Sequence, residues 1–257
     1  MINILLSGCN GKMGNAVAKS ILTNDNCTIV AGVDVIGSKN TSDFPVFLSP
    51  DEFSGKCDVI IDFSFHTATE GLLNYAVKNN IPVVLATTGH TKEETEIIKK
   101  TSERIPVFYS RNMSLGISLI IALAKKSCSF LGEDFDIEII EKHHNQKLDA
   151  PSGTALMIAD ALKDTRKTET EYIYDRHNVS QKRQKSEIGI HSVRGGTIVG
   201  EHEVIFAGKD EVITISHSAA SRNVFAEGAI RAAQFMVGKC PGLYNMNDII
   251  DSLIAEI

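Results

Sequence analysis

A turn that carries two histidines and a lysine is the part of this sequence most suited to chemistry. The apolar, β-branched run 135–140 predicts a buried strand, and His143 and His144 lie just past its end. Lys147 follows in a turn of exposed composition. A histidine beside a binding pocket can transfer a proton near neutral pH. The arrangement predicts proton transfer, with histidines satisfied by ordinary hydrogen bonds as the alternative.

The residues that follow this turn have the composition of an anion pocket. Pro151 restricts the backbone, and Ser152, Gly153 and Thr154 precede the apolar-periodic run 155–162, which predicts a helix. Free N–H groups at a helix start, two hydroxyls and a lysine ammonium together suit a carboxylate. The alternative is that Ser-Gly-Thr only caps the helix. Two adjacent histidines without further spaced ligands make a poor metal site, so we predict no metal.

The N-terminus has the pattern of a dinucleotide-binding unit. The apolar run 2–6 predicts a strand, residues 15–22 predict a helix, and Gly8, Gly11 and Gly14 lie between them. Glycine allows a pyrophosphate to approach the backbone at a helix start. The spacing is one residue off the commonest fingerprint, and a tight strand-to-helix turn without a ligand is the alternative.

A carboxylate follows the second predicted strand. Residues 27–33 predict this strand, and Asp34 at its end lies 20 positions beyond Gly14. In dinucleotide-binding domains an acidic residue at this place accepts hydrogen bonds from the adenine ribose. Together with the glycine turn, Asp34 predicts a bound nicotinamide dinucleotide.

Strands and helices alternate up to residue 113. Alternation at this spacing implies right-handed crossovers and a parallel sheet with ligands at the carboxyl ends of its strands. These ends carry small hydroxyl residues and glycine, which either line a cofactor site or cap the helices. Further strands are predicted at 57–64, 81–86 and 105–109, a small strand within 45–48, and helices at 67–78 and 92–103.

The second half of the chain predicts a different architecture. Residues 114–130 form the longest apolar helix pattern and lead into a second domain, whereas the polar stretch 165–187 is assigned no role. Turns at Gly195–Gly196 and Gly208–Asp210 separate runs that alternate apolar and polar residues, which is typical of β-hairpins. The predicted four-stranded, mostly antiparallel sheet consists of 136–142, 188–194, 197–207 and 211–218, and helices are predicted at 223–237 and 246–254.

Composition limits the remaining possibilities. The chain has 257 residues, 43% of them hydrophobic, and a formal net charge of −6, which favours a globular protein with a small-molecule partner over one that binds nucleic acid. Five cysteines without a Cys-x-x-Cys pair favour reduced thiols. Since we find no signal-peptide pattern and no run of about 18 apolar residues, we expect a cytoplasmic protein without a membrane anchor.

The segment from Glu141 to Ala155 resembles the signature of the dihydrodipicolinate reductases, also called 4-hydroxy-tetrahydrodipicolinate reductases, of the lysine and diaminopimelate pathway. It reads Glu-x-His-His-x-x-Lys-x-Asp-Ala-Pro-Ser-Gly-Thr-Ala, and the Gly-Lys-Met-Gly turn at 11–14 is also typical of these reductases. The resemblance implies NAD(P)H-dependent reduction of 4-hydroxy-tetrahydrodipicolinate to tetrahydrodipicolinate. It also implies a homotetramer, which we expect to assemble through a helix-free, apolar face of the second sheet.

The resemblance implies domains and site residues as well. The Rossmann-like nucleotide domain would be 1–113 with 222–257, and an α+β substrate-binding and oligomerisation domain would be 114–221. His143 would give a proton to the substrate, Lys147 would hold a carboxylate and activate the ring, and Asp149 would order the loop. The residues implied to bind the substrate carboxylates are His144, Lys147, Ser152, Gly153 and Thr154. Those implied to bind the cofactor are Gly8, Cys9, Asn10, Gly11, Lys12, Met13, Asp34, Ala86, Thr87, Thr88, Ser110, Arg111, Asn112 and Met113.

The residues near the expected ribose pocket favour NADH over NADPH. Asp34 would repel a 2′-phosphate, and Val35 follows where relatives that accept both cofactors often carry arginine. Lys12 and Lys39 would attract the phosphate, but a fixed carboxylate outweighs flexible, solvated lysines. We therefore expect NADH to be preferred and NADPH still to be used.

Two other functions stay open. A different two-domain NAD(P)-dependent dehydrogenase for an amino or keto acid would share the glycine turn and the domain plan. A non-catalytic dinucleotide sensor would share the turn and Asp34, but it would have no use for a histidine beside an anion pocket.

Overall fold

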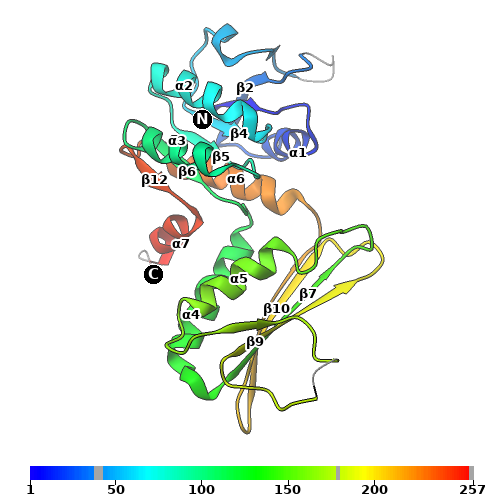
Figure 1. Cartoon of the computed structure of the whole chain (residues 1–257). Coiled ribbons are helices and arrows are strands. Elements are labelled where there is room, and N and C mark those ends of the chain that lie inside the picture. The colour runs from blue at the N-terminus through cyan, green and yellow to red at the C-terminus, as the bar shows by residue number, and fades with distance from the viewer. Residues whose placement is uncertain (38–42, 178–179, 255–257) are drawn as a thin grey trace. The chain divides into compact units, whose positions relative to one another are not determined.

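The computed structural model describes residues 1–37, 43–177 and 180–254 (Figure 1). The chain divides into two compact units, each with its own sheet. Unit 1 is Met1–Leu115 with Asn223–Ile257, and unit 2 is Gly116–Arg222.

Unit 1 is built on a parallel sheet with the strand order β12-β6-β5-β4-β1-β2-β3. The order changes direction at β1, which lies between β4 and β2, as in doubly wound dinucleotide-binding folds. The Rossmann-like prediction is therefore confirmed. The strands are β1 (Ile2–Ser7), β2 (Cys27–Val33), β3 (Val46–Phe47), β4 (Val59–Asp62), β5 (Val83–Leu85), β6 (Pro106–Tyr109) and β12 (Gly242–Tyr244). The helices are α1 (Lys12–Ile21), α2 (Thr69–Asn79), α3 (Lys92–Ser102), α6 (Asn223–Met236) and α7 (Met246–Ile254), with short 3₁₀ turns η1 (Pro50–Glu52) and η2 (His66–Ala68).

Helices cover both faces of this sheet (Figure 1). Val17 of α1 and Ala229 of α6 share a buried cluster with Leu6 of β1. Leu72 of α2 shares a second cluster with Leu5. Because successive residues of a strand point to opposite faces, Leu5 and Leu6 fill the two cores. A strand buried on both sides must be continuously apolar, which is why the run 2–6 predicts it.

The C-terminal part of the chain completes unit 1. Helix α7 is where the sequence predicts it. Strand β12, which the sequence analysis does not predict, pairs in parallel with β6 at the edge of the sheet. A three-residue strand is too short for its alternation to be recognised, so only its pairing partner reveals it.

Unit 2 is a five-stranded sheet with two helices on one face (Figure 1). The strand order is β11-β10-β7-β9-β8, in which β10 is antiparallel to both neighbours and β9 is parallel to both. Ile120 of α4 and Ile158 of α5 share one buried cluster with Ile139 of β7. The elements are α4 (Leu115–Leu131), η3 (Gly132–Asp134), β7 (Asp136–His143), α5 (Gly153–Lys163), β8 (Glu171–Ile173), β9 (Glu187–Arg194), β10 (Gly200–Ala207) and β11 (Val212–Ala219).

The prediction of the second sheet is wrong in the pairing of its strands and in their number. The hairpin expected at Gly195–Gly196 does not form, because β7 lies between β9 and β10. The turn instead folds back on the end of β7, where the Gly195 N–H donates to the His143 carbonyl at 2.9 Å. Alternation identifies a strand but not its partner.

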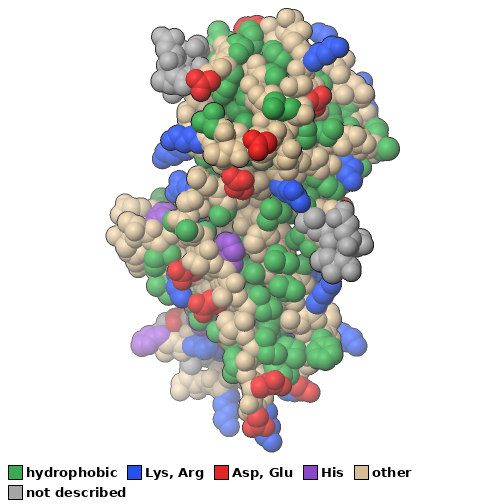
Figure 2. Space-filling view, turned by 180° about the vertical axis from the view of Figure 1, so that it is seen from behind, with side chains coloured by type: hydrophobic (Ala, Val, Ile, Leu, Met, Phe, Trp, Pro, Cys, Tyr) green, Lys and Arg blue, Asp and Glu red, His purple; other side chains and the backbone are tan. Residues whose placement is uncertain are grey.

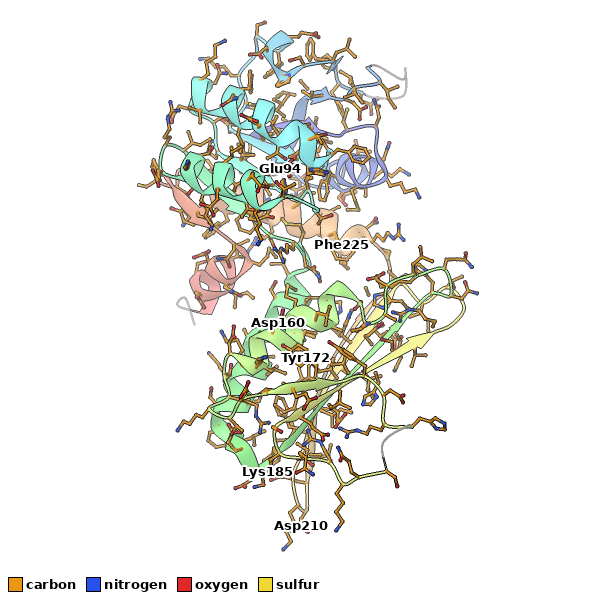
Figure 3. All side chains as sticks on the ribbon, in the orientation of Figure 1. Glu94, Asp160, Tyr172, Lys185, Asp210 and Phe225 are labelled. Atoms are coloured by element: carbon orange, nitrogen blue, oxygen red, sulfur yellow. The ribbon has the colours of Figure 1, made fainter. Side chains whose placement is uncertain are left out.

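The sheet has a fifth strand, β8, within the polar stretch 165–187. The hydroxyl of Tyr172 on β8 donates to the carboxylate of Asp160 on α5 at 2.7 Å, and the two residues lie close together in Figure 3. Tyr172 also packs against the core of unit 2. This tertiary support holds a strand whose composition is too polar to predict it.

The face of the sheet away from α4 and α5 carries ion pairs, so the expected apolar face is corrected. On β7, Glu138 and Lys142 alternate with the buried core residues. Lys142 pairs with Glu203 of β10 at 2.8 Å, and Arg183 donates to Glu138 at 3.0 Å. Ile140 lies between the two charged residues along the strand and is half buried.

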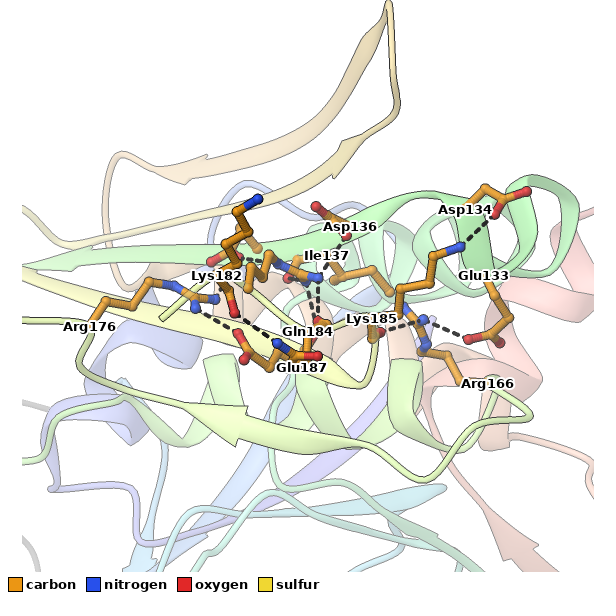
Figure 4. Close-up of polar contacts among 12 residues, drawn as sticks. Glu133, Asp134, Asp136, Ile137, Arg166, Arg176, Lys182, Gln184, Lys185 and Glu187 are labelled. Carbon is orange, nitrogen blue, oxygen red and sulfur yellow. Dashed lines mark hydrogen bonds and ion pairs between the residues drawn. The ribbon is translucent and has the colours of Figure 1, made fainter. Parts of the chain in front are cut away.

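Arginines of the stretch 165–187 bind this outer face, although the sequence assigned the stretch no role. Arg176 pairs with Glu187 at 2.6 Å (Figure 4) and with Glu138 at 3.2 Å. A side chain at Gly189 would overlap the Glu138 carboxylate, so glycine at this position makes room for the ion pairs.

Residues Leu115–Asp134, which comprise α4 and η3, are long and apolar enough to cross a membrane by length and composition. The expectation that no such stretch exists is therefore wrong at the level of hydropathy. Ile117, Ile120 and Ala124 are buried against the sheet of unit 2, whereas Leu119, Leu123 and Phe130 are exposed.

Basic side chains are dispersed on the face drawn in Figure 2. Lys and Arg lie singly among acidic and apolar side chains, and the described residues form no continuous basic area on this face. This distribution agrees with the negative net charge.

Candidate nucleotide cavity and active site

Close backbone contacts shape the glycine turn between β1 and α1. Gly8 has a φ of +73°, and a side chain there would lie 2.6 Å from the backbone carbonyl of Phe63. A side chain at Gly14 would overlap the Gly8 carbonyl oxygen. Helix α1 begins at Lys12, and Gly11 offers it no side-chain cap. Because the first N–H groups of a helix have no partner within it, the turn suits an anionic group such as a pyrophosphate.

A cavity of about 450 Å³ lies beside this turn, at the carboxyl ends of β1, β2 and β4. Its lining includes Gly8, Asn10 and Gly11 of the turn and Asp34 at the end of β2. The volume is in the range of small-molecule and cofactor sites. The exposed apolar side chains in the lining are Val35, Ile36, Leu48 and Phe65. An apolar wall with a carboxylate at one end suits the adenine ring and its ribose.

Asp34 is held in place by backbone N–H groups. One carboxylate oxygen accepts from the Asn10 N–H at 3.0 Å, and the other accepts from the Ile36 N–H at 3.1 Å. Asp51 adds a second acidic side chain to the lining, and the described residues that line the cavity include no lysine or arginine. Lys12 is exposed and is not part of that lining, while Lys39 lies outside the described residues.

The remaining residues expected to bind the cofactor lie in the turn itself or follow β5 and β6. Cys9 and Met113 are core residues, so only their backbones could face a ligand. The Thr87 hydroxyl donates to the buried Asp62 carboxylate at 2.8 Å, and the Ser110 hydroxyl donates to a backbone carbonyl. The side chains not buried in this set are Met13, Thr88, Ser110, Arg111 and Asn112.

In unit 2, a buried carboxylate joins His143 to an arginine. Nδ1 of His143 lies 2.6 Å from Glu141 Oε2, and both residues are on the core side of β7. Arg194, at the end of β9, donates to the two oxygens of Glu141 at 2.6 and 2.8 Å. The parallel register places Arg194 opposite His143, which brings the three groups together.

The start of α5 joins the same cluster. The Ser152 N–H donates to Glu141 at 3.1 Å, and the Ser152 hydroxyl accepts from the Ala155 N–H as a helix N-cap. The same hydroxyl lies 3.2 Å from Nε2 of His202 on β10. The Ser152 hydroxyl therefore caps helix α5, as the alternative interpretation of Ser-Gly-Thr expects, and it already has hydrogen-bond partners within the protein.

Burial and charge set the protonation of this cluster. Burial alone would raise the pKa of Glu141, but hydrogen bonds from Arg194 and His143 lower it to about 2. Burial, with His143 nearby, lowers the pKa of His202 to about 4. At neutral pH the cluster therefore holds a carboxylate, a guanidinium and a neutral His202.

The turn after β7 contributes a lysine and a second histidine. The Lys147 ammonium pairs with the Asp149 carboxylate at 2.9 Å. Nδ1 of His144 is buried and has no hydrogen-bond partner among the described residues. Gly153 is the first residue of α5 and is exposed, and Thr154 follows it, half buried. Unit 2 therefore brings all the predicted substrate residues to one turn and one helix start.

Models of the two parts of one enzyme family match the chain. "Dihydrodipicolinate reductase, N-terminus" matches residues 2–113 and "Dihydrodipicolinate reductase, C-terminus" matches residues 116–250. The chain belongs to the dihydrodipicolinate reductase family.

Individual members of the dihydrodipicolinate reductase family are similar over nearly the whole chain. The 4-hydroxy-tetrahydrodipicolinate reductase of Caldanaerobacter subterraneus subsp. tengcongensis is 54% identical over 97% of this chain and 98% of its own. That of Clostridium tetani is 51% identical over 98% of each. A dipicolinate-bound dihydrodipicolinate reductase from Paenisporosarcina sp. TG-14 superposes with a TM-score of 0.81, at 25% identity, and covers 95% of this chain and 97% of its own.

Sequence reasoning missed two residues of the cluster around Glu141 and Ser152. Arg194 and His202 lie more than 45 residues after the histidine turn and carry no local motif. The available signal was alternation: His202 lies on the inward side of β10 with Gly200, Val204 and Phe206, where burial makes a polar side chain unusual. Glu141 belongs to the predicted motif, but the spacing of the motif does not show that Glu141 contacts His143, Arg194 and Ser152.

Proposed function

We propose that this protein catalyses the NAD(P)H-dependent reduction of 4-hydroxy-tetrahydrodipicolinate to tetrahydrodipicolinate, a step of lysine and diaminopimelate biosynthesis. The observation that carries the proposal is the buried contact between His143 and Glu141 beside the start of α5, in a member of the dihydrodipicolinate reductase family.

The protein's own groups would bind and protonate the substrate. Lys147 and the N–H groups at the start of α5 would hold its carboxylates, and a carboxylate would replace Asp149 as the partner of the Lys147 ammonium. The unpartnered Nδ1 of His144 is available for the same anion. The 4-hydroxyl and a hydrogen of the adjacent carbon would leave together as water, which creates a double bond between that carbon and C4. C4 would then receive the hydride, and His143 would give a proton to the adjacent carbon.

The residues of unit 1 fit a nicotinamide dinucleotide. A side chain at Gly8 would fill the space against Phe63, the cavity lies at the switch point of the sheet, and Asp34 is fixed at the ribose end. The bound nicotinamide supplies the hydride that C4 of the substrate receives.

Cofactor oxidation in the presence of the freshly formed condensation product of pyruvate and aspartate semialdehyde tests this function. We expect turnover that depends on that product. Turnover with simple amino or keto acids instead would indicate another dehydrogenase, and tight dinucleotide binding without turnover of either substrate type would indicate a sensor.

The same assay tests the cofactor preference. We expect kcat/KM to be higher with NADH than with NADPH by about tenfold or less, on the order of 1.4 kcal/mol, because Asp34 repels a 2′-phosphate. Asp34→Asn should narrow the difference. Asp51→Asn is the matched control, because it removes one negative charge from the same cavity without touching the residue at the end of β2. A clear preference of the wild-type protein for NADPH would contradict the predicted effect of Asp34 on the 2′-phosphate.

A further inference from the structure

The carboxylate of Glu141 accepts hydrogen bonds from Arg194, which donates from two nitrogens, and from the backbone N–H of Ser152, and both of these groups can only donate. The side chain of Ser192 hydrogen-bonds the same carboxylate. With these partners the carboxylate is ionised at neutral pH, and it cannot itself donate to a ring nitrogen. Its contact with Nδ1 of His143, at 2.6 Å, therefore needs a proton on that nitrogen.

Nε2 of His143 lies on the opposite side of the ring and has a different environment. Gly200 on β10 is its neighbour, and a side chain there would stand 3.1 Å from Nε2, so glycine leaves that nitrogen room. The ring of His202 lies edge to face with His143, with centroids 5.3 Å apart, and it is neutral at pH 7. His202 thus places no positive charge beside the His143 ring.

We propose that Glu141, held by Arg194, is a positioning residue that keeps a proton on Nδ1 of His143, so that Nε2 carries the proton given to the substrate. The inference rests on the proposed function for the identity of the acceptor, but the placement of the two ring protons is a property of the protein alone. The hydrogen-bonded carboxylate fixes the orientation and the tautomer of the imidazole, as a carboxylate does for the histidine of a catalytic triad.

Nitrogen-15 NMR of the protein labelled at the imidazole nitrogens of histidine tests the tautomer directly. Signals of His143 are assigned by their loss in His143→Asn. At a pH where the ring is neutral, we expect a protonated Nδ1 and an unprotonated Nε2 in the wild-type protein. A protonated Nε2 beside an unprotonated Nδ1 would overturn the proposal, and this measurement needs no variant of Glu141 to fold.

Glu141→Gln provides the second arm. An amide accepts weakly and can also donate, so the fixed Nδ1 proton should be lost and kcat should fall by at least about tenfold, part of the 10²-fold to 10⁴-fold that a general acid supplies. The affinity for NADH should stay unchanged. Arg194→Lys keeps a cation near Glu141 without the two-point contact, and it should retain the Nδ1 proton with a smaller loss of kcat.

Glu138→Gln is the matched control. Glu138 lies on the same strand and also contacts a histidine and an arginine, His191 at 2.7 Å and Arg183 at 3.0 Å, but on the outer face of the sheet. The Glu138→Gln substitution should leave the His143 signals unchanged. Loss of the Nδ1 proton in Glu138→Gln as well, or full kcat in a folded Glu141→Gln, would show that Glu141 has no specific positioning role. If the wild-type protein shows the expected tautomer but does not turn over the substrate, the proposed function fails and the positioning of His143 stands.

Discussion

At the scale of single residues, the proposed proton donor and the proposed carboxylate-binding residue lie in different surroundings. His143 is buried and bound to Glu141, whereas Lys147 lies in a turn and pairs with the exposed Asp149. A buried imidazole with a fixed partner is suited to proton transfer, and a mobile ammonium is suited to binding an anion. The two residues should therefore fail in different ways when they are removed.

His143→Ala should lower kcat by about 10²-fold to 10⁴-fold with little change in the affinity for NADH, because only general acid catalysis is lost. Lys147→Ala should raise KM for the substrate as well as lower kcat. Lys142→Ala is the control, since Lys142 precedes His143 on β7 but pairs with Glu201 and Glu203 on the outer face. Steady-state kinetics measure kcat and KM, and direct titration measures the affinity for NADH. Near-normal turnover of His143→Ala would rule out His143 as the acid.

At the scale of elements, buried titratable groups join two strands and a helix. Glu141 of β7 lies opposite His202 of β10 in the antiparallel register, and Ser152 at the start of α5 contacts both. Such groups make the stability of this junction depend on pH, because their pKa values differ between the folded and the unfolded chain.

The stability of unit 2 should fall on acidification in two steps. His202 has a folded pKa of about 4, below its ordinary value of 6.5, so the unfolded chain binds the proton more readily. Its contribution is present above pH 6.5 and is lost as the pH falls to about 4, which amounts to about 3 kcal/mol. The pKa of Glu141, lowered from 4.5 to about 2, adds a second loss between those two values.

Hydrogen exchange of amides in β7 and β10 between pH 7 and pH 4 measures the first step. His202→Gln should flatten the dependence in this range, whereas His177→Gln, at an exposed position, should leave it unchanged. A wild-type stability that stays constant between pH 7 and pH 4 would contradict the neutral, buried state of His202.

At the scale of the whole molecule, we propose that four chains assemble through the outer face of the second sheet. That face has no helix on it, and its ion pairs are interspersed with the half-buried Ile140 and Ile205. Mixed apolar and paired charged residues suit a specific contact between identical surfaces.

Light scattering at micromolar concentration should give about four times the chain mass of 28.0 kDa. Ile205→Glu places an unpaired charge in the proposed contact and should lower the mass. Leu22→Glu changes an exposed apolar residue of unit 1 and should not. A wild-type mass of one chain would exclude the assembly, and an unchanged mass for Ile205→Glu would move it to another surface.

The sequence by itself determined the features that depend on neighbouring residues. The alternation of strand and helix, the glycine turn followed by Asp34 and the histidine turn before α5 are written in local periodicity and turn chemistry. These features were enough to predict the parallel sheet and to recognise the family. They also predicted His143 and Lys147 as site residues, since both belong to one continuous motif.

Only the tertiary structure decided which distant residues meet. Alternation marks strands without naming their partners, so the insertion of β7 between β9 and β10 was invisible, as was the support that Asp160 gives to β8. The same limit hid two contacts of the proposed site. Arg194 reaches Glu141 across 53 positions of sequence and His202 reaches Ser152 across 50, and each depends on the register of a sheet that the whole of unit 2 must fold to create.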